Sequence, residues 1–130
     1  MILVDSSVWI AVFRKKNPYR IEDSLELDEV ITCLPVIQEI LQGFREERAY
    51  RTARDAMLAL PIVESPMEES LFMEAAQLYR SARRHGLTVR SSADCLIAAC
   101  ALRHNAPVLH RDRDFDLLCE VSPLQAKTIP

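Results

Sequence analysis

Short apolar runs alternate with longer helix-forming segments along this chain, and the alternation strongly limits the folds that it can adopt. The runs are rich in β-branched residues, and they lie at residues 2–4, 30–34, 62–63 and 107–109. Parallel strands need long crossover connections, usually helical, and the segments between the runs have that length and pattern. The sequence therefore predicts an α/β fold in which helices cover both faces of a mainly parallel sheet.

The first three helices are predicted from the spacing of apolar residues. Residues 8–13 are apolar nearly all round, which indicates a buried helix, and a second helix is expected over residues 36–44. Residues 45–60 contain many good helix formers and are expected to form the third helix. The apolar face of this third helix is expected to comprise Ala53, Ala56, Met57 and Leu60.

Two further helices are predicted from signals at their N-termini. Ser65-Pro66, followed by acidic residues, is typical of a helix start, and the helix is expected to run to Gly86. Ser91 precedes Asp94 by three residues, which is the spacing of a capping box with aspartate in place of the usual glutamate. This pair is expected to open an apolar helix in the interior of the protein.

The size and composition of the chain indicate one domain, residues 1–130, because 49% of the residues are apolar and can fill one core. No apolar run is long enough to span a membrane, so no membrane partner is expected. The four cysteines form no CxxC pair, which favours free thiols and a cytoplasmic location.

The net charge of −3 excludes a general attraction to nucleic acid, so any contact with phosphate must be local. Three basic clusters are candidates for local contacts of this kind. They are Arg14, Lys15 and Lys16; Arg80, Arg83 and Arg84; and Arg90, Arg111 and Arg113.

Four acidic residues are placed where an α/β protein has its functional crevice. Asp5 ends the first predicted strand, Glu39 lies in the helix after the second, Asp94 opens a helix, and Asp112 follows the last strand. The carboxyl ends of parallel strands meet at one edge of the sheet, so these side chains are expected to converge. Converging carboxylates raise one another's pKa and need a compensating cation. Oxygen ligands of this type suit Mg²⁺ or Mn²⁺.

A divalent ion at this edge would lower the pKa of a bound water and would reverse the local negative charge. The sequence therefore predicts hydrolysis of a nucleic-acid backbone by a metal-activated water. Two simpler interpretations stay open, in which Asp94 is only the acid of a capping box and Glu39 is only a solvated helix position.

Three motifs occur in the order found in one nuclease family. They are VDSSVWI at residues 4–10, SADCLIAA at residues 92–99 and RDRDF at residues 111–115. Together they resemble the PIN-domain ribonucleases, most of all the VapC toxin branch, and the resemblance covers nearly the whole chain. It implies a PIN-like three-layer α/β/α domain with about five parallel strands, and Mg²⁺- or Mn²⁺-dependent endoribonuclease activity.

The resemblance also assigns the site residues. The positions that match the family's acidic quartet are Asp5, Glu39, Asp94 and Asp112. Asp114 matches an additional acid, so the implied metal ligands are Asp5, Asp94, Asp112 and Asp114. Ser6 stands where the family commonly has a small hydroxyl residue, which implies a helper in binding metal-water or phosphate. His110 replaces the usual threonine, and it is expected either to be structural or to contact a metal-bound water or phosphate.

The implied partners are an RNA substrate, a cognate antitoxin protein and a second copy of the chain in a homodimer. In the family, an antitoxin segment lays apolar residues into a groove between helices and places a basic side chain at the acidic pocket. The aromatic residues expected to line this groove are Trp9, Phe13, Phe44 and Tyr50.

Two alternative functions are weighed against a ribonuclease. A phosphoryl-transfer or phosphatase domain also carries acids at strand ends, but Ser7 stands where a second aspartate is expected, and no lysine follows the late strands. The other alternative is a non-catalytic module in which the acids hold a structural metal and the helices bind a partner. Measured cleavage activity separates this module from an enzyme.

Overall fold

The computed structural model describes residues 1–130, and strands and helices alternate along it as the sequence predicts. The elements in chain order are β1 (Ile2–Val4), α1 (Ser6–Phe13), β2 (Val30–Cys33), α2 (Leu34–Leu41), α3 (Glu47–Leu58), β3 (Ile62–Val63), α4 (Glu69–Arg84), α5 (Ser92–Arg103), β4 (Val108–His110), α6 (Arg113–Cys119) and β5 (Ala126–Thr128). Two short 3-10 helices, Ile21–Asp23 and Leu27–Glu29, precede β2.

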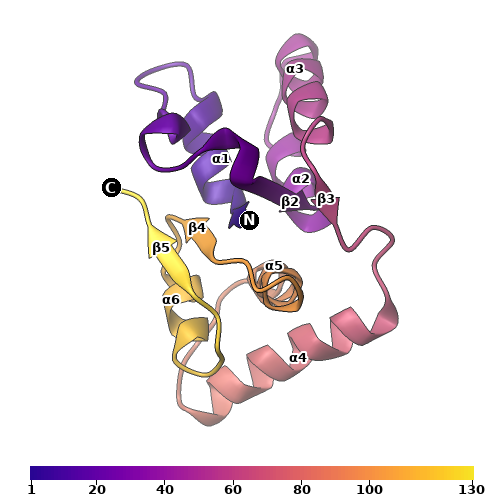
Figure 1. Cartoon of the computed structure of the whole chain (residues 1–130), viewed down its shortest axis with the longest axis vertical. Helices are drawn as coiled ribbons and strands as arrows, with labels where there is room; N and C mark the ends of the chain where they lie inside the picture. Colours follow the sequence, from indigo (N-terminus) through magenta and orange to yellow (C-terminus); the bar gives the residue numbers. More distant parts are fainter.

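All five strands run parallel in one sheet, in the order β3-β2-β1-β4-β5. Helices α1, α2 and α3 lie on one side of the sheet, and α4, α5 and α6 lie on the other (Figure 1). The predicted three-layer α/β fold is therefore confirmed. The chain leaves β1 toward one side of the sheet and β4 toward the other, so these neighbouring strands form the switch point of the topology. In open α/β sheets, ligands bind outside the carboxyl ends of the strands at such a point.

The interior strands and helix α5 form the centre of the core. Leu3 and Val4 on β1 are fully buried, as expected for a parallel strand that is covered on both faces. Most residues of α5 are buried as well, which confirms that it is an interior helix. The core cluster comprises 30 buried residues. No helix combines the length and the apolar character that a membrane crossing requires.

Helix α4 begins later than the sequence signal indicates. The first helical residue is Glu69, with Glu68 at the N-cap position, so the predicted start at Ser65-Pro66 is wrong. The residue just before that pair, Glu64, has a positive φ of 55°, and its carboxylate accepts a hydrogen bond of 2.7 Å from Arg103. This ion pair holds the segment as a loop across the end of α5.

Two other features differ from the sequence prediction. In α3 only Ala53 and Met57 are buried, whereas Ala56 is exposed, because α3 packs on α2 at the edge of its layer and buries a narrow stripe. No apolar run predicted β5, whose residues Lys127 and Thr128 are exposed. An edge strand of this kind is fixed by its pairing with β4 and needs little apolar sequence.

Candidate metal centre

Five acidic side chains gather at the carboxyl ends of β1 and β4. Asp5 follows β1 directly, and Asp112 and Asp114 lie in the turn and first helical residues after β4. Asp94 is in the first turn of α5, and Glu39 lies in α2. The structure thus brings every acid of the predicted site together at the switch point of the sheet, although these residues are up to 109 positions apart in the chain.

Asp5 has two roles at this position. Its carboxylate Oδ2 caps α1 by accepting hydrogen bonds from the main-chain N–H of Ser7 at 3.0 Å and from the Ser7 hydroxyl at 2.5 Å. The other oxygen, Oδ1, is buried and has no partner. Burial raises the pKa of Asp5, and the hydrogen bonds from Ser7 oppose that shift. One carboxylate oxygen is therefore anchored while the other is available to a ligand.

Glu39 is oriented by a hydroxyl group from a different helix. Ser6 is buried, and its Oγ donates a hydrogen bond of 3.0 Å to Glu39 Oε1. Burial raises the pKa of the half-buried Glu39, and the charges of Asp5 and Asp112 raise it further. In the structure the predicted helper Ser6 therefore contacts an acid of the site.

Asp94 is the most strongly perturbed acid of the site. It is 3% exposed, and its Oδ2 has no hydrogen-bond partner. Burial, followed by the charges of Asp5 and Asp112, raises the pKa of Asp94 to about 9. Ser91 occupies the N-cap position of α5 but makes no side-chain capping bond, so the capping-box alternative for Asp94 is wrong.

The two acids after β4 are held by the start of α6. Asp112 caps this helix, and its Oδ1 accepts a hydrogen bond of 3.0 Å from the N–H of Asp114. Asp114 is 1% exposed, and its Oδ2 accepts a hydrogen bond of 3.0 Å from the N–H of Arg90. The guanidinium Nε of Arg90 lies 4.0 Å from Asp114 Oδ1, which places one cation at the rim of the acidic site.

His110 is fully buried, and both of its ring nitrogens face protein groups. Nδ1 accepts a hydrogen bond of 3.0 Å from the N–H of Asp112, and Nε2 lies 3.2 Å from Asp116 Oδ1. This arrangement favours the structural alternative over a contact with a metal-bound water or phosphate. Ser7 was not predicted as a site residue, and the only signal for such a role is a hydroxyl two residues after Asp5 at a helix start.

The acids form two overlapping groups that can each hold a metal ion. One group is Asp5, Glu39 and Asp94, the other is Asp94, Asp112 and Asp114, and the ligand atoms within each group lie within 4.8 Å of one another. Opposite ligands of Mg²⁺ lie about 4.2 Å apart, because each oxygen sits about 2.1 Å from the ion. Three buried carboxylate oxygens without hydrogen-bond partners belong to these groups. The donor set therefore fits a hard divalent ion.

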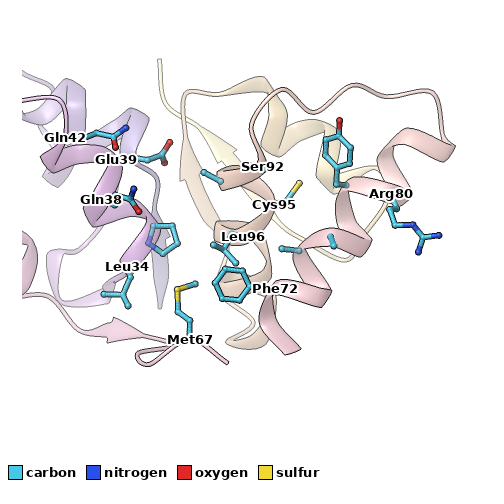
Figure 2. A pocket seen from close by; sticks show the side chains of 15 residues that line it. Leu34, Gln38, Glu39, Gln42, Met67, Phe72, Arg80, Ser92, Cys95 and Leu96 are labelled. Atoms are coloured by element: carbon cyan, nitrogen blue, oxygen red, sulfur yellow. The ribbon is translucent and has the colours of Figure 1, made fainter. Parts of the chain in front are cut away.

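An apolar groove opens beside the acidic site. It has a volume of about 820 Å³, α2 forms one wall and α4 with α5 forms the other, and Glu39 lies on the α2 wall (Figure 2). The aromatic residues expected to line an antitoxin groove lie outside this one. Trp9, Phe13 and Phe44 pack on one another with ring centroids about 6 Å apart, and none of them lines this groove. Tyr50, on α3, does not line it either.

Comparison with known proteins agrees with the fold. The family model described as "PIN domain" matches residues 2–121. The chain therefore belongs to the PIN-domain family. Within that family it falls among the VapC proteins: it is 39% identical to ribonuclease VapC11 of Mycobacterium tuberculosis and to VapC ribonuclease Mb1587 of Mycobacterium bovis. Each alignment covers 97% of this chain and 97% of the relative.

Solved structures share the fold at lower sequence identity. VapBC2 from Rickettsia felis, bound to a DNA fragment from its promoter, superposes with a TM-score of 0.79 at 18% identity, over 100% of both chains. VapBC-5 from Mycobacterium tuberculosis has a TM-score of 0.73 at 19% identity, over 98% of both chains. These similarities confirm the PIN-like arrangement of sheet and helices.

Proposed function

We propose that the protein is a metal-dependent endoribonuclease and the toxin of a VapBC-type toxin–antitoxin pair. The observation that carries the proposal is the pair of overlapping carboxylate groups that share Asp94 at the switch point of the sheet. Relatives at 39% identity over nearly the full chain are named ribonucleases, which supports the same activity here.

The acids would hold Mg²⁺ or Mn²⁺ through the free carboxylate oxygens. Asp5, Asp94, Asp112 and Asp114 are the proposed ligands, with Glu39 beside them. When bound, the ion supplies a water of lowered pKa and a positive charge opposite the phosphate. Burial is the largest cause of the raised pKa values of Asp5, Glu39 and Asp94, so the ionised forms of these carboxyl groups gain most from a bound cation.

Arginines at the rim would bind the RNA backbone. The net charge of −3 gives no general attraction, so phosphate contacts must come from local cations. Arg90 is 69% exposed and lies beside Asp114, while Arg111 and Arg113 are exposed in the turn that carries Asp112. We propose that these three guanidinium groups bind the phosphates that flank the cleaved bond.

The apolar groove is the proposed binding site of the antitoxin. Its walls carry side chains that are large, apolar and partly exposed, including Phe72 at 46% and Leu34 at 37%. Figure 2 shows Glu39 at the same groove. A basic side chain of a peptide bound in the groove could therefore reach the acidic site. Homodimer formation is also proposed, and analytical ultracentrifugation measures it directly.

Cleavage assays with matched variants test the enzymatic proposal. Wild-type protein with Mn²⁺ is expected to cleave RNA, and Asp5→Asn or Asp94→Asn is expected to abolish cleavage while the circular dichroism spectrum stays native. Asp28→Asn, an exposed acid outside the site, removes the same charge and is expected to keep full activity. Unchanged cleavage by either site variant would contradict the mechanism.

Metal dependence gives an independent check. Excess chelator is expected to stop cleavage, and added Mg²⁺ or Mn²⁺ is expected to restore it. Full activity in chelator would exclude the metal-water mechanism, and an inactive protein that binds Mn²⁺ tightly would favour the non-catalytic module.

A further inference from the structure

The turn between β4 and α6 carries two of the acids, and side chains hold its main chain. The N–H of Arg111 donates to Ser7 Oγ at 2.9 Å, and the N–H of Asp112 donates to His110 Nδ1 at 3.0 Å. The next capping bond runs from the N–H of Asp114 to Asp112 itself. The position of the turn therefore depends on two side chains, Ser7 and His110, that are not ligands.

We infer that His110 is a positioning residue for the metal-binding turn. Through Nδ1 it fixes the main chain of Asp112, and with it the carboxylates of Asp112 and Asp114 relative to Asp94. This inference rests on the proposed function, because it assigns His110 a role in holding the proposed metal ligands.

The imidazole itself is held firmly in place. His110 is 0% exposed, its main-chain oxygen accepts a hydrogen bond from Ile129, and β4 lies between β1 and β5 in the sheet. Its ring centroid is 5.3 Å from that of Phe115, which is also fully buried. Because Nδ1 accepts a hydrogen bond, the ring proton lies on Nε2, which is buried without a hydrogen bond although Asp116 Oδ1 on α6 lies 3.2 Å away. The ring thus joins the end of β4 to the turn through Nδ1, and to α6 through its packing on Phe115.

Accurate placement matters here because like charges must be held together. The ligand atoms of Asp94, Asp112 and Asp114 lie within 4.8 Å of one another, and repulsion between carboxylates favours their separation. Ligands that are already in place bind an ion more tightly than ligands that must be ordered first, and outer groups commonly change metal affinity about 10- to 100-fold. Ser7 anchors the same turn to Asp5 and is the second support.

Two amide substitutions separate positioning from simple packing. In His110→Asn, the amide oxygen can take the place of Nδ1, because both atoms are two bonds from Cβ. In His110→Gln, the amide reaches the place of Nε2 but leaves the N–H of Asp112 without its acceptor. Glutamine fills more of the buried space than asparagine, so a packing role predicts that His110→Gln is the milder change. A positioning role predicts the opposite order.

The readout is the affinity for Mn²⁺, measured without RNA by electron paramagnetic resonance. His110→Asn is expected to bind Mn²⁺ within about threefold of wild type, and His110→Gln about tenfold or more weakly, as for the loss of one buried hydrogen bond. RNA cleavage at subsaturating Mn²⁺ is expected to follow the same order. Equal affinities, or tighter binding by His110→Gln, would overturn the inference.

The outcome can be distinguished from failure of the proposed function. If the order of Mn²⁺ affinities holds but no variant cleaves RNA, the ribonuclease proposal fails and the positioning role stands. Should His110→Asn not fold, ¹⁵N NMR of the wild-type ring decides the question: the inference requires a proton on Nε2 and slow hydrogen exchange at the Asp112 amide. A proton on Nδ1 would overturn it.

Discussion

Replacing Asp94 by asparagine is expected to stabilise the protein in the absence of metal while removing its activity. Asp94 is 3% exposed, and its pKa is raised from 3.8 to about 9 by burial and by neighbouring acids. In the unfolded chain the carboxyl group loses its proton near pH 4, whereas in the folded protein it keeps the proton up to about pH 9. The unfolded state therefore binds fewer protons in this window, so the stability that Asp94 contributes falls as the pH rises from about 4 to about 9.

The size of the effect follows from this window. About three pH units separate pH 7 from the unfolded pKa of Asp94, and each unit corresponds to 1.36 kcal/mol, so the cost at pH 7 approaches about 4 kcal/mol. This figure is an upper limit, because the charges of Asp5 and Glu39 contribute to the raised pKa of Asp94 and these two acids have raised pKa values themselves. Asparagine does not ionise, so it removes this cost while keeping nearly the same shape and volume. The variant should therefore be more stable than wild type at pH 7 and about equally stable at pH 4.

Urea unfolding followed by circular dichroism at several pH values, with chelator present, measures this difference. Adding Mn²⁺ at about 100 times its Kd is expected to stabilise wild type by about 2.7 kcal/mol and to leave Asp94→Asn nearly unchanged. Asp28→Asn serves as the control and is expected to show no such trend with pH. The reasoning is refuted if Asp94→Asn is no more stable than wild type near pH 7.5, or if the difference does not grow between about pH 5 and pH 7.5.

Three further outcomes are expected. Phe115→Ala should lower the free energy of unfolding in urea by about 3–5 kcal/mol, because the ring is fully buried in the core; a loss under about 1 kcal/mol would contradict this. Arg103→Gln should lower the melting temperature by a few degrees, because Arg103 forms ion pairs with Glu64 in the β3–α4 loop and with Glu74 on α4. This loss should be smaller in about 1 M NaCl, where salt screens the ion pairs. Ser6→Ala should slow RNA cleavage about tenfold because Glu39 loses its hydrogen bond. Added to Glu39→Gln, it should cause little further loss, and additive effects would argue against the coupling.

The sequence alone was enough to predict the layer architecture and the position of the site. Apolar runs separated by helical segments leave few alternatives to a parallel sheet, because parallel strands require crossovers. Asp5 follows β1 directly and Asp112 lies two residues after β4, and the carboxyl ends of neighbouring parallel strands meet at one edge. Their convergence therefore follows from chain order and topology, and the family motifs identified the same residues.

Only the tertiary structure decided what individual side chains do at that edge. Asp94 fits a helix cap by spacing, but packing buries it among other acids and leaves Ser91 without a capping bond. The contacts of Ser6 with Glu39 and of Ser7 with Arg111 join residues 33 and 104 positions apart. A short polar side chain has several possible partners nearby in sequence, and burial in the folded protein selects one of them. For that reason local pattern located the acidic site, and long-range packing determined how its residues are held.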